Sequence, residues 1–387
     1  MSADRGDPVA ARSAGAGLGA ADANAARGRR RRLLFRLRRS LRLVEQRERI
    51  QDMGYGMLAA ALALSLPAAP PFEAGGEVAR RMGGAEEVTQ GLLLPVSRGT
   101  AEFVDGAAPE TIVRLVAALA FGAALTLTLA FLRRLGFRRT SAVPATFAAF
   151  AAPYAFLGAT SPIDHAPGML GAALVLWSLF NQEQSTRRGY HWRAILSAGL
   201  AYMLHPALCL VVPAVALAVA RHPDYRAQGP TNFFAVLAVL SMSIAIGLGG
   251  QGEAARVAHL AERALAGAAD FGPGALLAWT VQLPLGLGVT LFGLYQMIFA
   301  ARSVEAKRAP TWIVPWCLAA LAPVLAGSPD HAPIAPFLVP AGALGIADWL
   351  NRRGEARLEA RWGAILLVLQ LAATAAIAAA PHLLDGR

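Results

Sequence analysis

Apolar stretches of about 20 residues recur along the whole chain and are separated by short polar turns. A helix of about this length crosses the hydrocarbon of a bilayer, where backbone groups must pair within their own segment. Hydrophobic residues make up 56% of the 387 residues, which excludes an ordinary soluble domain. The pattern therefore predicts an all-α fold, a polytopic bundle of transmembrane helices. The candidate spans are 53–71, 110–132, 140–158, 167–181, 193–220, 231–249, 275–300, 310–327, 334–350 and 361–381.

The N-terminal region divides into two parts before the bundle, which we assign to residues 51–387. Residues 1–26 are mostly small and polar, without apolar periodicity, and are predicted to form a disordered tail. Residues 27–50 are rich in arginine, with leucines at helical spacing, and predict a basic amphipathic helix on the anionic cytoplasmic leaflet. The chain carries a net charge of +11. No basic stripe with interleaved aromatic residues accompanies this charge, so we interpret it as the positive-inside bias of a plasma (inner) membrane protein and expect no nucleic-acid partner.

The charges of the turns predict an orientation for the spans. With the basic N-terminus in the cytoplasm, the acid-rich loop 72–109 lies outside and the arginine-rich turn 133–139 lies inside. A count in which every span crosses once then places the basic turns 301–309 and 351–361 outside, against the rule.

The long segment 193–220 resolves this conflict. Pro206 and Pro213 interrupt it, and proline removes a backbone donor and breaks a helix. We predict two short helices that enter and return there, a broken re-entrant pair, beside about nine full spans. Every later basic turn then lies inside, and the loops 250–273 and 328–333 lie outside. A kinked single span remains the alternative.

Two of the outer turns have nearly the same sequence, SPIDHAP at 161–167 and SPDHAP at 328–333. Helix capping explains Asp164 and Asp330, since aspartate caps a helix and proline fits its first turn. It does not explain why His165 and His331 follow them. Three functions fit the Asp-His pairs: holding a divalent cation such as Mg or Mn, binding a phosphate through protonated histidine, or orienting a substrate hydroxyl.

The acids of the first outer loop are the candidate catalytic residues. An acid at the membrane surface is well placed to act as a general base. The alternative is a solvated loop that follows the charge bias. In the second outer loop, 250–273, Arg256 is a candidate to bind a lipid phosphate, with a plain amphipathic surface helix as the alternative. The first-loop candidates are Glu73, Glu77, Glu86 and Glu87.

A first span, a long acidic outer loop and a second span that ends in a basic turn resemble the GT-C superfamily of membrane glycosyltransferases, in particular its mannosyltransferase-like members. So do the run from Ala145 to Phe180, the segment 194–220 and the late sequence APFLVPAGALGIADWL at 335–350. The resemblance implies transfer of a sugar on the outer face, from a polyprenyl-phosphate donor held in the membrane lipid to a glycan, lipid or protein acceptor. It implies a catalytic role for Glu73 or Glu77, then Glu86 or Glu87, and a substrate-binding role for Asp164 and His165.

The chain also departs from the GT-C pattern. The early acids of its first outer loop are all glutamates, where the superfamily usually has paired aspartates. A non-catalytic GT-C-like subunit is therefore one alternative. A transporter or flippase for a lipid-linked substrate is another. Apart from His205 the spans hold almost no ionisable residue, which counts against a proton-coupled carrier.

Overall fold

The computed structural model describes residues 46–65, 109–160, 165–184, 190–204, 208, 284–300 and 338–379. All regular structure among these residues is helical, and none of them lies in a strand, which confirms the all-α prediction. The chain divides into two compact units, Met1–Asp52 and Met53–Arg387. Residues 46–52 are helical in the first unit, and the remaining description concerns the second.

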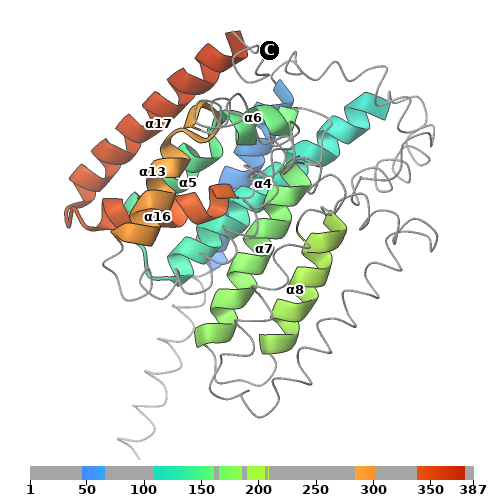
Figure 1. Cartoon of the computed structure of the whole chain (residues 1–387), viewed down its shortest axis with the longest axis horizontal. Helices are drawn as coiled ribbons and strands as arrows, with labels where there is room; N and C mark the ends of the chain where they lie inside the picture. The colour runs from blue at the N-terminus through green and yellow to red at the C-terminus, as the bar shows by residue number, and fades with distance from the viewer. Residues whose placement is uncertain are drawn as a thin grey trace, which may run out of the picture. The chain divides into compact units, whose positions relative to one another are not determined.

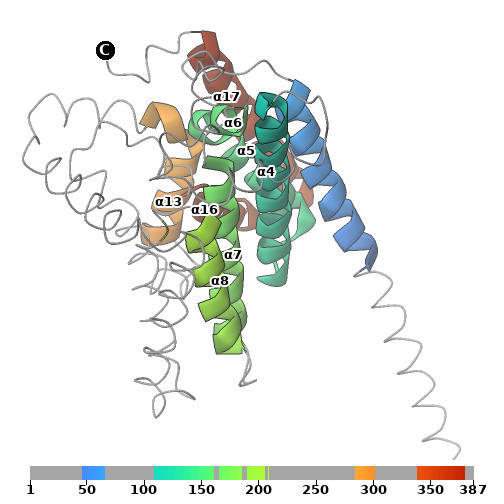
Figure 2. The same ribbon diagram turned by 90° about the vertical axis from the view of Figure 1, so that its right-hand side faces the viewer.

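Eight helices of the second unit set its described architecture (Figure 1), and a further helical segment, 53–65, packs against the first of them through a close approach of Gly56 to Gly122. The bounds are α4 Pro109–Arg134, α5 Arg139–Phe150, α6 Pro153–Thr160, α7 His165–Gln184, α8 Tyr190–Leu204, α13 Val289–Phe299, α16 Val339–Asn351 and α17 Ala356–Ala379. Helix α4 packs against α7, and α7 packs against α8, as Figure 2 also shows.

Two of the described helices are long and apolar enough to cross a membrane, judged by length and composition. They lie in α4, at Thr111–Arg134, and in α17, and agree closely with the predicted spans 110–132 and 361–381. In α4, 61% of the most apolar stretch is buried inside the protein, whereas in α17 the share is 22%. Helix α4 is therefore a core helix, and α17 forms an outer wall.

Residues 140–158, predicted as one helical span, do not form one continuous helix, because the chain breaks there into α5 and α6. Pro153, the first residue of α6, has no N–H to continue the hydrogen-bond ladder. The carbonyl groups at the break find partners on other helices. Thr290 donates to the carbonyl oxygen of Ala149 at 3.3 Å, and Thr374 donates to that of Ala151 at 2.5 Å. The break thus joins α5 to α13 and α17.

Helix α16 is the most deeply buried of the described helices. Nearly all of its residues are shielded from solvent, and it packs against α13, α5, α4, α7 and α17. A Cβ atom on Gly345 would collide with the carbonyl oxygen of Gly293 in α13, and one on Gly293 would collide with that of Gly342. Glycine at all three positions lets the backbones of α13 and α16 approach closely.

Helix α8 is described as far as Leu204, and Pro206, where the sequence predicts a break, lies outside the described residues. Leu208 is buried and lies near Gly171 of α7. Residues 209–220, which carry the predicted return of the re-entrant pair, lie outside the described residues.

Candidate functional site at the arginine-rich end of the helices

Arginines gather where two helical hairpins turn, at the end of α4 and start of α5 and at the end of α16 and start of α17. Cations at a helix C-terminus are favoured by the helix dipole, which suits the last turn of α4. Each turn contains a glycine at positive φ, Gly136 at 87° and Gly354 at 76°, a conformation that other residues rarely adopt. We call this region the arginine end. Its arginines are Arg133, Arg134, Arg138, Arg139, Arg352, Arg353, Arg357 and Arg361.

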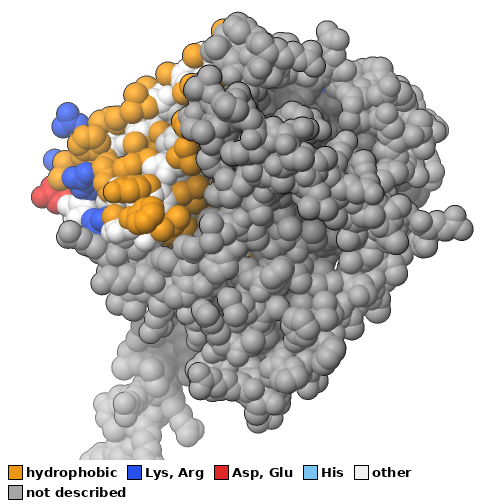
Figure 3. Space-filling model, in the orientation of Figure 1, with side chains coloured by type: hydrophobic (Ala, Val, Ile, Leu, Met, Phe, Trp, Pro, Cys, Tyr) orange, Lys and Arg blue, Asp and Glu red, His pale blue; other side chains and the backbone are white. Residues whose placement is uncertain are grey.

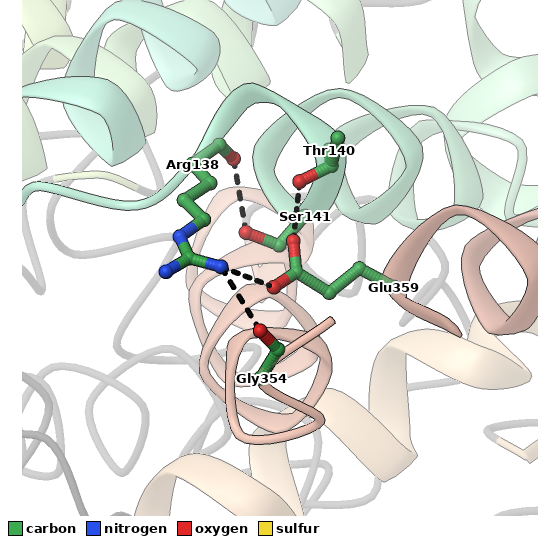
Figure 4. A network of polar contacts seen from close by, with 5 residues as sticks. All are labelled: Arg138, Thr140, Ser141, Gly354 and Glu359. Carbon is green, nitrogen blue, oxygen red and sulfur yellow. Dashed lines mark hydrogen bonds and ion pairs between the residues drawn. The ribbon is translucent and has the colours of Figure 1, made fainter. Parts of the chain in front are cut away.

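The two turns are in direct contact, although they lie far apart in the sequence (Figure 4). The Nη1 atom of Arg138 donates to the carbonyl oxygen of Gly354 at 3.1 Å and lies 3.6 Å from Oε1 of Glu359. Thr140 donates its hydroxyl to Oε2 of Glu359. The start of α5 and the start of α17 are therefore joined at the same end of the protein.

Glu359 is the buried centre of this contact. Its side chain is 0% exposed, while that of Arg138 is 60% exposed. An ion pair with one exposed partner contributes at most about 1 kcal/mol to stability. The hydrogen bond from Thr140 and the position in the first turn of α17, where the helix dipole favours an acid, also stabilise the carboxylate. Glu359 thus works as a structural joint between the hairpins.

A second buried acid ties α13 to the same end. Asp348 is 1% exposed, and its Oδ2 lies 3.5 Å from Nε of Arg352. The Nη2 atom of Arg352 donates to Oε1 of Gln296 in α13 at 2.8 Å. The C-terminal ends of α13 and α16 therefore meet at the arginine end.

Several arginines of this end lie over aromatic rings. The guanidinium of Arg353 lies 4.4 Å from the ring centroid of Trp349 and 5.4 Å from that of Trp362. Arg134 lies over Trp177 at 5.6 Å, and Arg139 lies over Tyr55 at 5.4 Å. Basic residues mixed with tryptophan and tyrosine are typical of the boundary between lipid and water on the cytoplasmic side of membrane proteins.

The structure does not test the predicted catalytic and binding residues. Outside the described residues are Glu73, Glu77, Glu86, Glu87, Asp164, Arg256, Asp330 and His331. His165 is the first residue of α7, but its side chain is also outside the described set. The convergence of these residues on one site stays a prediction. Within the described ranges no cluster of three or more His, Cys, Asp or Glu side chains exists that could hold a metal, so a Mg or Mn site also stays a prediction.

Sequence reasoning missed the polar residues inside the apolar helices. Gln370 of α17 accepts a hydrogen bond from the backbone N–H of Val289 at 2.6 Å, and Thr374 bridges to the break after α5. The sequence signal that could have found two of them is a polar residue within an apolar stretch, at Asp348 and Gln370. Such residues rarely remain without a partner, but the sequence does not say which segment supplies it.

Comparison with known proteins finds no family model, no curated protein and no solved structure that matches this chain. The GT-C resemblance therefore depends on the sequence pattern alone.

Proposed function

We propose that this chain is a multi-pass protein of the plasma membrane with its arginine end and its N-terminus in the cytoplasm. The contact of Arg138 with Gly354 and Glu359 carries this proposal. If 193–220 crosses the membrane once, an odd number of predicted spans separates these two turns, and they belong on opposite faces. Contact between them fits an even number of spans, which the proposed re-entrant pair would give.

The directions in which α7 and α16 run support an outer position for both Asp-His turns. His165 begins α7, and Trp177 further along that helix contacts Arg134 at the arginine end. The separation along the helix is about 18 Å, so α7 starts far from that end. Helix α16 also runs toward the arginine end, which it reaches at Arg352. The second Asp-His turn precedes the start of α16 in the sequence.

On the outer face we propose transfer of a sugar from a polyprenyl-phosphate donor, as the GT-C resemblance implies. Glu73 or Glu77 takes the proton of the acceptor hydroxyl while its oxygen forms a bond to the anomeric carbon. The bond from that carbon to the phosphate oxygen breaks, and polyprenyl phosphate leaves. Histidines in the protonated form and Arg256 would bind the phosphate, and the remaining acids would position sugar hydroxyls. The proposed binding residues are Glu86, Glu87, Asp164, His165, Asp330, His331 and Arg256.

The test is donor consumption by the purified full chain in proteoliposomes, with a panel of polyprenyl-phosphate hexoses and pentoses and a membrane extract as acceptor. We expect the unaltered chain to consume one donor. We expect Glu77→Gln, or Glu73→Gln if that residue is the base, to lower the rate by about 100-fold or more, the usual contribution of a general base. The matched control is Glu355→Gln, an exposed acid of the turn 352–355 at the opposite end, which should leave the rate unchanged.

A well-folded chain that consumes no donor would contradict the enzymatic proposal. Co-purification with a stoichiometric partner would then favour the non-catalytic GT-C-like subunit. Uptake or flipping of a labelled lipid-linked sugar, without transfer, would favour the transporter.

A further inference from the structure

The corner between α16 and α17 combines an exposed apolar wall with arginines that form no ion pair among the described residues. The outer side of α17 presents large apolar side chains to the surroundings, and Figure 3 shows this face with basic side chains gathered at one end of it. The helix has 24 residues, about 36 Å in length, enough to cover the hydrocarbon of a bilayer. The exposed side chains are Leu358, Trp362, Ile365, Val368, Leu369 and Leu371.

Arg353 stands at the basic end of this wall in a fixed orientation. Its guanidinium lies against Trp349 and Trp362, whose rings pack edge to face with centroids 5.9 Å apart. Stacking engages the flat face of a guanidinium and leaves its N–H edge free to bind an oxyanion. Among the described residues, the side chain of Arg353 has no hydrogen bond or ion pair, in contrast to Arg352 and Arg138.

The α16–α17 corner carries more positive than negative charge. Asp348 and Glu359 are already paired with Arg352 and Arg138. Among the described residues of this corner, this leaves three exposed arginines, Arg353, Arg357 and Arg361, against one exposed acid, Glu355. The corner therefore attracts a ligand with negative charge at one end and apolar character along the rest of its length.

We propose that the α16–α17 corner binds an anionic diacyl phospholipid, with its headgroup phosphate on the N–H edge of Arg353 and its acyl chains along the outer side of α17. An amphiphile would contact both the arginines and the apolar side of α17, whereas free phosphate would contact only the arginines. The site is distinct from the outer-face chemistry and rests only on the membrane placement proposed above.

The experiment uses the tryptophans of the corner as reporters. The full chain is reconstituted into phosphatidylcholine vesicles that contain brominated phosphatidylglycerol or, in a parallel sample, brominated phosphatidylcholine, and quenching of tryptophan fluorescence is measured. We expect stronger quenching by the anionic lipid at equal mole fraction. Arg353→Ala should reduce this preference by roughly fivefold, the effect of one arginine near an anionic surface, and Arg353→Lys should lose part of it.

The matched control is Arg134→Ala, which removes the same charge from the stack on Trp177 of α7. It should keep the preference for the anionic lipid. Equal quenching by the two lipids, or an equal loss in Arg134→Ala and Arg353→Ala, would overturn the lipid site and leave the membrane placement intact. Absence of quenching by either lipid would overturn both. Sugar transfer is measured separately, so its failure does not bear on this site.

Discussion

Helices α16 and α17 follow one another through the turn 352–355, yet one is buried on nearly every side and the other is largely exposed. Both are apolar, so apolarity alone does not distinguish them. Gly342 and Gly345 lie three residues apart on one face of α16, opposite Gly293 of α13, and small residues at such spacing allow close helix contact. The outer side of α17 carries large residues instead. Side-chain size along a helix face therefore separates core from wall here.

The largest expected effect comes from filling the α13–α16 crossing. Gly345→Ala should lower the free energy of unfolding in detergent by about 3 kcal/mol, because the new Cβ meets a backbone carbonyl that cannot move aside as a side chain would. The control Ala372→Leu adds more atoms to the exposed side of α17 and should change the stability little. Equal losses in the two variants would show that α16 is not the inner helix.

The next effect concerns the polar joint between α17 and α13. Gln370→Leu should cost about 2 kcal/mol, because it leaves the N–H of Val289 without its acceptor in a buried place. Thermal unfolding in detergent measures this loss, with Val368→Leu on the same helix as the exposed control. A neutral Gln370→Leu variant would mean that another group or water takes the role.

A smaller effect is expected where the two hairpins meet. Glu359→Ala should cost about 1–2 kcal/mol, and Arg138→Ala less than about 1 kcal/mol, since the arginine is mostly exposed. A double-mutant cycle should give a favourable coupling energy of about 0.2–1 kcal/mol. A coupling energy near zero would argue against contact between the turns.

The smallest effect is expected on the outer wall. Val368→Ala, at a side chain that is 64% exposed, should change the stability in detergent by less than about 0.5 kcal/mol. A loss above about 1 kcal/mol would show that another part of the protein covers α17, which would also remove the proposed lipid site.

The sequence was sufficient to predict the helical class and the two long apolar helices, since length and apolarity of a stretch are local properties. The break before Pro153 was missed because the apolar run continues through it, although a helix commonly ends before proline. The bundle's pairing of Arg138 with Glu359 links distant segments, so no local pattern identifies it. The charge argument placed the two turns on the same side of the membrane, and in the structure they are in contact.

The predicted outer site could be inferred only from two nearly identical turn sequences and from the GT-C resemblance. Asp164 lies outside the described residues, so the capping role that the sequence predicts for it stays a prediction. Whether the glutamates of 72–109 and the second Asp-His turn approach Asp164 depends on long-range packing. These residues lie outside the described ranges, so their convergence stays a prediction.

The most direct test of the account is the labelling of single cysteines in intact cells with a maleimide that cannot cross the membrane. The background chain has Cys209 and Cys317 replaced by serine, and the probes are Asp164→Cys, Asp330→Cys and Glu355→Cys. We expect Asp164→Cys and Asp330→Cys to be labelled from outside the cell. We expect Glu355→Cys to be labelled only after the membrane is permeabilised. Labelling of Glu355→Cys from outside, or of only one of the two aspartate positions, would contradict the shared cytoplasmic end and the outer site that depends on it.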